Sequence, residues 1–529
     1  MEANIDIIYP LKQLVKFIQL KHGTFNAVIS VQTSKSKKVG CVKETLASNK
    51  TEVPDVANEV VISLYASQEK IYQRSTFGFF TKWRWAMIWI TQIVFYGIPW
   101  LEWGHRQALL FDLGTRRFYI FNLVLYPQDL IYLTAILIIS ALSLFLFTAI
   151  AGRLWCGYTC PQTVYTEIFM WIEHKIEGER GARMKLDSAG MSSNKLIKKS
   201  AKHFVWITFA LWTGFSFVGY FTPIRDLAHS VINLSLGPWE TFWICFYGFA
   251  TYGNAGFMRE QVCKYMCPYA RFQSAMFDDD TLIVTYDEAR GEPRGARSRK
   301  DDAKSKELGS CIDCGLCVQV CPTGIDIRKG LQYECIGCGA CADVCDTVMD
   351  KVGYERGLVK YSTQNAMNNN WTKKEMLQRI LRPRVIIYAA VLSILVGSLL
   401  TSLWLRTPFR VDVVRDRGVM SRLSDDGMLE NVYRLQIMNG TEITQHYQMS
   451  VSGLEGLKIE MADSDHSSKN KENSESVMVK PAEARWVIVD LKVPDGTIQP
   501  GSHKINFHIK AIESNQSIEE KSIFLVPRS

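Results

Sequence analysis

The sequence predicts a multi-domain membrane protein in which an α-helical transmembrane bundle carries a cysteine-rich insert and a C-terminal β-sandwich. Three patterns in the 529 residues predict this fold class. They are apolar blocks of about 20 residues, two runs of closely spaced cysteines, and an alternation of apolar and polar residues after the last apolar block. The length of the chain allows three or four folded units.

Five apolar blocks rich in Trp and Phe are separated by polar stretches. Each block has roughly the 20 residues that a helix needs to cross about 30 Å of hydrocarbon. Trp85, Trp100, Trp103 and Trp404 lie at block ends, and aromatic residues concentrate at membrane–water interfaces. A set of buried core helices is the alternative, and it does not explain these tryptophans. The sequence therefore predicts about five spans, near 85–103, 129–150, 203–222, 239–257 and 385–405.

Lysine and arginine residues are distributed unevenly along the chain, whose net charge is +8. Segment 151–202 carries nine of them, whereas the connection 223–238 carries only Arg225. Because cytoplasmic loops are enriched in Lys and Arg, 151–202 is expected in the cytoplasm. Five spans then place 258–384 in the cytoplasm and 406–529 outside. The first 80 residues contain no secretory signal, so the first span is expected to direct insertion and to leave the N-terminus inside.

Cysteine positions agree with this topology, because none of the 14 cysteines lies after residue 345. Free thiols are typical of the reducing side of a membrane. Eight of the cysteines form two runs, 311–322 and 335–346. Each run has the spacing C-x2-C-x2-C-x3-C of bacterial two-cluster ferredoxins. The insert is therefore predicted to be a two-cluster bacterial ferredoxin-like domain.

The spacing also indicates which cysteines share a [4Fe–4S] cluster. Three thiols separated by two residues wrap one cluster, and the fourth cysteine of each run binds the other cluster. Asp346 replaces the Pro that usually follows the second run, but no ligand is lost. We assign Cys311, Cys314, Cys317 and Cys345 to the first cluster and Cys335, Cys338, Cys341 and Cys321 to the second. Two zinc sites are the alternative, although zinc sites seldom use three cysteines at successive x2 spacings.

A second cysteine pattern, C-x3-C-P, occurs twice, each time just after an even-numbered predicted span. Cys156 and Cys160 follow the second span, and Cys263 and Cys267 follow the fourth. If the helix continues, both thiols of a pair lie on one face, and the following proline would end that helix or begin the next. Four thiols could then converge beneath the bilayer as a redox or metal site, since soft thiolates favour Cu(I), zinc or iron–sulfur chemistry. Buried structural cysteines are the alternative.

The domain boundaries follow from these patterns. They are a cytoplasmic N-terminal tail at 1–84, four spans with their C-x3-C-P motifs at 85–257, a cytoplasmic linker at 258–310, the ferredoxin-like domain at 311–352, the fifth span at 385–405, and an external domain at 406–529. In the external domain, runs such as 432–437, 485–491 and 504–509 alternate apolar and polar residues between turn signals. This pattern predicts an immunoglobulin-like β-sandwich.

Taken together, these residues resemble the FixG/CcoG-type cytochrome oxidase accessory proteins over about 63–527, whereas residues 1–60 fall outside the resemblance. The resemblance rests on both ferredoxin runs and on Pro127-Gln128-Asp129, 156–180, Tyr220-Phe221-Thr222-Pro223, 259–278 and 290–295. It implies a multi-pass protein of the bacterial inner (cytoplasmic) membrane, with a cytoplasmic insert and a periplasmic C-terminal domain. It further implies a role in assembling the cbb3-type haem–copper oxidase and a Cu(II)-reducing activity that supplies Cu(I).

We therefore predict an oxidoreductase, a cupric reductase, with two [4Fe–4S] clusters and copper. Electrons from an unidentified donor would reach Cys156, Cys160, Cys263 and Cys267, where Cu(II) would become Cu(I). A quinol-linked respiratory relay and a non-enzymatic assembly scaffold acting through the external domain are the alternatives. The expected partners are the lipid bilayer and either oxidase assembly factors or copper chaperones and transporters. Nucleic acid is not expected, because membrane topology explains the basic segments.

Overall fold

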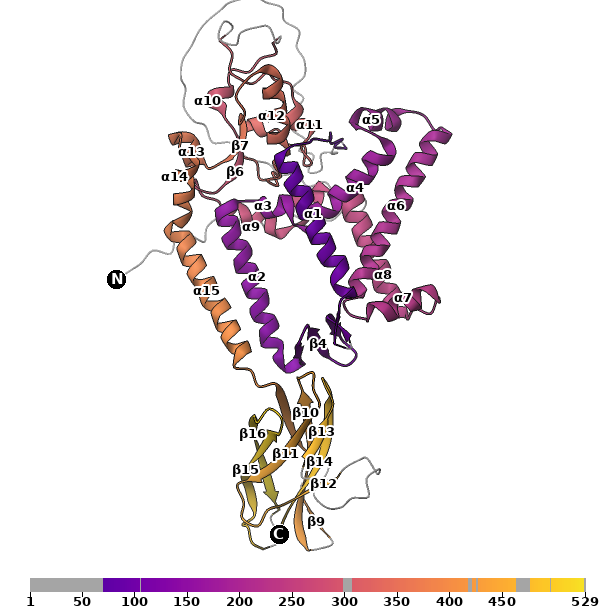
Figure 1. Cartoon of the computed structure of the whole chain (residues 1–529), viewed down its shortest axis with the longest axis vertical. Coiled ribbons are helices and arrows are strands. Elements are labelled where there is room, and N and C mark those ends of the chain that lie inside the picture. The colour runs from indigo at the N-terminus through magenta and orange to yellow at the C-terminus, as the bar shows by residue number, and fades with distance from the viewer. Residues whose placement is uncertain are drawn as a thin grey trace, which may run out of the picture. The chain divides into compact units, whose positions relative to one another are not determined.

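The computed structural model describes residues 70–104, 106–297, 307–416, 421–424, 427–462, 476–494 and 496–527 (Figure 1). Most of the predicted tail 1–84 lies outside the described residues. Its described end is not a separate tail, because helix α1 already begins at Phe79. The carboxylate of Asp343 in the insert accepts hydrogen bonds from the N–H groups of Phe80 (3.1 Å) and Thr81 (2.7 Å), which caps this earlier start. The predicted boundary at 84 is therefore wrong.

Helices occupy most of each predicted span, although the first span ends earlier than 103 and the third earlier than 222: α1 Phe79–Gly97, α2 Leu130–Ala151, α6 Ser193–Val218, α8 Pro238–Thr251 and α15 Pro383–Trp404. Among the described residues, two helical segments are long and apolar enough to cross a membrane, Pro127–Ala151 and Pro383–Trp404. The α-helix α8 has only 14 residues and continues as a π-helix, η3 Tyr252–Met258. Helix α2 packs beside α15, and α6 packs beside α8 (Figure 1). The bundle of five spans stays a prediction.

The connection between α1 and α2 contains short strands that the sequence analysis did not predict. Strands β1 Glu102–Trp103 and β2 Arg106–Gln107 form a pair, and β3 Leu109–Asp112, β4 Arg117–Ile120 and β5 Leu123–Leu125 form an antiparallel meander. The short helices η1 Ile98–Trp100 and η2 Pro127–Asp129 flank these strands, and α7 Ile224–Ile232 follows α6. Tyr119 and Val124 of the meander pack against Met438 and Ala482 of the C-terminal domain.

Short helical elements surround the two C-x3-C-P motifs. They are α3 Leu154–Tyr158, α4 Pro161–Glu177 and α5 Arg180–Ser188 after α2, and the π-helix η4 Val262–Met266 and α9 Pro268–Met276 after η3. In each motif the proline is the first residue of a new helix, α4 or α9. Proline is favoured at this position because its missing N–H would have no partner inside the helix and its fixed φ suits the first turn.

Two strands outside the predicted limits 311–352 close the insert. Strand β6 Ile283–Tyr286 pairs antiparallel with β7 Val359–Ser362, and both contribute to one apolar core with Cys311 and Met349. The predicted linker 258–310 is therefore wrong in part, because burying the apolar side chains of β6 requires this pairing. The remaining elements are α10 Glu288–Gly291, α11 Leu316–Gln319, η6 Ile327–Lys329 and α12 Ala340–Val352, followed by α13 Gln364–Asn369, α14 Lys373–Gln378 and η7 Arg379–Leu381.

The C-terminal domain is a sandwich of two antiparallel sheets, as the alternating pattern predicted. One sheet has the order β12-β14-β10-β8, with β9 beside β10, and the other has the order β13-β11-β15-β16. Tyr433, Leu435 and Ile437 of β10 face Phe507 and Ile509 of β15 within one core. The strands are β8 Phe409–Arg415, β9 Arg422–Leu423, β10 Met428–Asn439, β11 Gln445–Ser452, β12 Lys458–Ala462, β13 Ser476–Val479, β14 Ala484–Pro494, β15 Gly501–Ala511 and β16 Ser517–Val526.

Candidate iron–sulfur and thiol site

The first cavity of the insert is lined by four cysteines from both runs. These are Cys311, Cys314, Cys317 and Cys345, the predicted ligands of the first cluster. Burial raises the pKa of Cys345 to about 12, and the nearby thiols of Cys317, Cys311 and Cys314 add to this effect. Cys345, which is 28 or more positions from the other three cysteines in the sequence, thus meets them around one cavity.

The second cavity is lined by the other predicted set. Cys321, Cys335, Cys338 and Cys341 contribute to its walls, and Cys317 reaches it from the first run. Burial raises the pKa of Cys341, and the thiols of Cys338, Cys335 and Cys321 raise it further. The structure therefore brings each predicted set of cysteines together around its own cavity, and the fourth cysteine of each run lies with the opposite set.

The two runs reach this arrangement by the same local geometry. Gly315 has φ +64° and directly precedes α11, and Gly339 has φ +72° and directly precedes α12. This left-handed conformation favours glycine, and at Gly339 a β-carbon would also approach the ring of Phe80 to 2.9 Å. The third cysteine of each run, Cys317 or Cys341, then lies in the first turn of the helix.

The donor set of each cavity fits a [4Fe–4S] cluster. Each cavity offers the four cysteine sulfurs that such a cluster requires. Burial raises the pKa of Cys317 to about 11 and that of Cys335 to about 12, so these thiols keep their protons when no cation is near. A bound metal ion deprotonates a coordinating thiol, because its positive charge offsets the free-energy cost of burying a thiolate.

The four C-x3-C-P thiols also converge, although not on two continuous helices. Cys156 lies in α3 and Cys263 in η4, whereas Cys160 and Cys267 are the N-terminal caps of α4 and α9. Each helix breaks between its two cysteines and the proline begins a new helix, so the condition for a shared helical face, one continuous helix, is not met. Burial raises the pKa of Cys263 to about 12, and the nearby thiols of Cys160, Cys156 and Cys267 contribute. Among the described residues, no three His, Cys, Asp or Glu side chains are arranged to hold a single metal ion.

The first C-x3-C-P motif packs directly on the second cavity. Cys156 contacts the apolar cluster that contains Cys338, Ile336 and Val320. A β-carbon at Gly157 would lie 2.8 Å from the carbonyl oxygen of Ile336 and 2.9 Å from the α-carbon of Cys338. Gly157 therefore allows the backbone of α3 to touch the second cysteine run. Arg153 reinforces this contact, because its guanidinium donates to the carbonyl oxygens of Tyr333 and Ala270.

Gln273 of α9 is a further polar neighbour of this site. Its side chain is 1% exposed, and its Nε2 donates to the Sγ of Cys156 at 3.3 Å. A single glutamine has no spacing that marks it as functional, so sequence reasoning missed it. Its hydrogen bond acts against the effect of burial, which raises the pKa of Cys156 to about 11.

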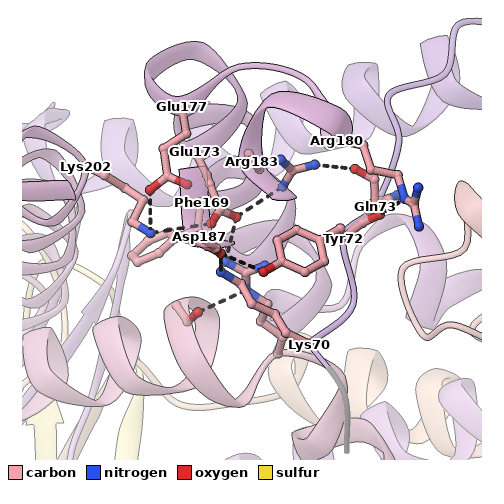
Figure 2. Close-up of polar contacts among 12 residues, drawn as sticks. Lys70, Tyr72, Gln73, Phe169, Glu173, Glu177, Arg180, Arg183, Asp187 and Lys202 are labelled. Carbon is pink, nitrogen blue, oxygen red and sulfur yellow. Dashed lines mark hydrogen bonds and ion pairs between the residues drawn. The ribbon is translucent and has the colours of Figure 1, made fainter. Parts of the chain in front are cut away.

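A buried charge network surrounds Glu173 of α4 (Figure 2). Glu173 of α4 accepts a hydrogen bond from Arg259 Nη2 at 2.9 Å and pairs with Arg183 and Lys202. Burial alone would raise the pKa of Glu173, but Arg259, Lys202 and Arg183 lower it to about 2. Gln162 Nε2 also donates to the carbonyl oxygens of Asn254 (2.9 Å) and Arg259 (3.0 Å). Helix α4 follows Cys160 and Arg259 precedes Cys263, so these contacts hold the two motifs side by side.

Two relatives of known name match most of the chain. The nitrogen fixation protein FixG of Rhizobium meliloti is 35% identical over 430 residues, which cover 75% of this chain and 82% of FixG. Protein RdxB of Cereibacter sphaeroides is 37% identical over 407 residues, which cover 75% of this chain and 85% of RdxB. This chain belongs to the FixG family. It is an iron–sulfur electron-transfer protein of the FixG type.

Family models match three parts of this FixG-family chain. A 4Fe–4S dicluster domain matches residues 258–364, which include both cavities and the strands β6 and β7. The immunoglobulin-like fold at the C-terminus of FixG matches 399–527. A 4Fe–4S binding domain matches 133–178, which contains Cys156 and Cys160. The iron–sulfur and immunoglobulin-like parts of the predicted fold are therefore confirmed.

Proposed function

We propose that this FixG-family protein is a membrane-bound cupric reductase that supplies Cu(I) for assembly of a cbb3-type cytochrome oxidase. The single observation that carries the proposal is the contact of the first C-x3-C-P motif with the second cavity. The Cys156 thiol thereby lies beside the predicted iron–sulfur ligands, with the other three thiols nearby, and thiolates favour Cu(I) over Cu(II).

The proposed ligands of the clusters are the two cysteine sets that line the cavities. When bound, the clusters supply one-electron transfer, which matches the single electron that converts Cu(II) to Cu(I). Cys156, Cys160, Cys263 and Cys267 bind the copper ion, and Gln273 orients the Cys156 thiol. Copper is a substrate here, and a transient substrate does not need a prearranged set of three ligands.

The proposed location is the bacterial inner membrane, crossed about five times. The apolar helices Pro127–Ala151 and Pro383–Trp404 support a membrane location. The lysine- and arginine-rich segment 151–202 supports a cytoplasmic position for the cysteine sites and a periplasmic one for the β-sandwich. On this basis the periplasmic domain faces the oxidase assembly factors or the copper chaperones.

A second role for the C-x3-C-P thiols is ligation of a further iron–sulfur cluster. The match of a 4Fe–4S binding domain to 133–178 favours it, because this segment contains the first pair. The mutual approach of all four thiols is compatible with either role.

A double substitution, Cys156→Ser with Cys263→Ser, tests the proposal. The insert keeps its eight cysteines, so the variant should retain about eight irons and the EPR signals of the reduced clusters. With the clusters first reduced by dithionite and the excess dithionite removed, so that each cluster can supply one electron, the variant should lose most of its Cu(II) reduction, measured anaerobically by trapping Cu(I) with a chelating dye. Cys245→Ser is the matched control, because this exposed thiol lies on α8 and belongs to neither cysteine site.

Three outcomes of this experiment are informative. Copper reduction at the wild-type rate in the double variant would contradict the assignment of the copper site. Loss of iron beyond that of the control would favour the further cluster. Absence of copper reduction by the wild-type protein, with its clusters intact, would refute the reductase function as a whole.

A further inference from the structure

A cavity of about 600 Å³ lies where α6, α8 and the turn between β3 and β4 meet. None of its lining residues is a cysteine, so it is separate from the iron–sulfur and thiol sites. Part of the segment Tyr220-Phe221-Thr222-Pro223, on which the family resemblance rests, lines this cavity. Its volume is within the range of about 300–1,000 Å³ that is typical of small-molecule sites.

One wall of the cavity is a continuous row of aromatic rings. The ring of Phe217 is centred 4.0 Å from that of Tyr247 and 5.4 Å from that of Phe221. The ring of Trp243 stacks on Tyr247 with centroids 5.6 Å apart. Trp239 also lines the cavity, at the start of α8. Aromatic faces carry partial negative charge, so such a wall attracts cations.

The polar side-chain groups of the lining are two carboxylates, the hydroxyls of Thr222 and Tyr247, and two indole N–H groups. Asp112 accepts hydrogen bonds from the N–H (3.0 Å) and the hydroxyl (2.7 Å) of Thr115, which fixes its place at the turn. Glu240 lies in the first turn of α8. Neither carboxylate makes an ion pair with a described residue, and no described Lys or Arg lines the cavity. Both carboxylates are half-buried where they line this space, and that of Glu240 also lies over Gly237 at the N-terminus of α8.

We propose that this cavity binds an organic ammonium group attached to an apolar body. The carboxylates of Asp112 and Glu240 neutralise the ammonium, and the aromatic wall contacts both the cation and its apolar body. Neutral apolar compounds would bind only through contact of their apolar body with the aromatic wall. The ligand is either a soluble amine or the amine headgroup of a phospholipid, since both present the same chemistry. This inference does not depend on copper reduction.

The test compares two probes of nearly the same shape, 2-phenylethylammonium and neutral 2-phenylethanol. Calorimetric titration of the full-length protein in a neutral detergent measures the affinity of each. The ammonium should bind at least tenfold more tightly than the alcohol. Glu240→Gln and Trp243→Leu should each weaken ammonium binding by at least fivefold. Glu102→Gln is the matched control, because Glu102 pairs with Arg225 at 2.9 Å and does not line the cavity.

Equal affinity for the two probes would overturn the proposal, as would an equal loss of affinity in Glu240→Gln and Glu102→Gln. Iron content and thermal unfolding of each variant establish that it is folded. A further arm uses nanodiscs of phosphatidylglycerol with and without phosphatidylethanolamine. Competition of phosphatidylethanolamine with 2-phenylethylammonium would identify the lipid as the source, and its absence would identify a soluble amine.

Discussion

Gly157→Ala is the sharpest perturbation of the contact between the first C-x3-C-P motif and the second cavity. The added methyl carbon would lie 2.8 Å from Ile336 O, 2.9 Å from Cys338 Cα and 3.0 Å from Cys338 N. Ordinary contacts begin near 3.4 Å, so α3 and the second run must separate by about 0.5 Å. All three atoms belong to the backbone, which cannot rotate away as a side chain can. Overpacking of this kind costs about 1–3 kcal/mol.

The expected result is a local weakening of the second cavity. A cost of about 1–3 kcal/mol changes an opening equilibrium by a factor of about 5–160. Iron should therefore be lost to a chelator several-fold faster, and the EPR signal of one reduced cluster should change before that of the other. Anaerobic chelator challenge followed by EPR measures both effects.

Gly181→Ala and Gly253→Ala are the controls, because a β-carbon at either position meets nothing within 4 Å. Wild-type iron loss and unchanged spectra in Gly157→Ala would refute the close contact. An equal effect in the two control variants would show that the change is not specific to the second cavity.

Two further predictions concern the buried charge network and the topology. Glu173→Gln leaves Arg183, Lys202 and Arg259 without their shared carboxylate, so thermal unfolding should show a loss of about 3–5 kcal/mol. The pKa of Glu173 is lowered from 4.5 to about 2. Its contribution to the stability of the fold is therefore fully present above pH 4.5 and is lost as the pH falls towards 2. Identical dependence of stability on acid pH in the variant and the wild type would contradict this. Reporter fusions after residues 190 and 350 should behave as cytoplasmic and a fusion at 529 as periplasmic, and an external signal at 350 would contradict the proposed topology.

Three cysteines of each set could be predicted from the sequence because their geometry is local, and the fourth because the spacing is that of bacterial two-cluster ferredoxins. The spacing C-x2-C-x2-C-x3-C keeps three thiols on one loop, and Gly315 and Gly339 supply the turn that each loop needs. The strands of the C-terminal sandwich were predictable for a related reason, since a half-buried strand alternates its side chains between two faces. In both parts, neighbours in the sequence determine the local structure.

Contacts between distant segments could not be predicted in this way. Strand β6 is too short for its sequence pattern to predict a strand. Its place in the insert depends on pairing with β7. Gln273 reaches Cys156 only because α9 packs near α3. The prolines of the C-x3-C-P motifs left two possibilities, the end of one helix or the start of another, and the structure shows the second.

Asp129 illustrates how a motif of the family resemblance has a structural reason in this chain. Its fully buried carboxylate pairs with Arg406 at 2.6 Å and with Arg410 at 2.8 Å. Asp129 directly precedes α2, Arg406 follows α15, and Arg410 lies in β8 of the sandwich. One carboxylate thus joins the ends of the two most apolar helices to the C-terminal domain. Separation of the sandwich from these helices would leave the charges without their partners, so the ion group stabilises this junction.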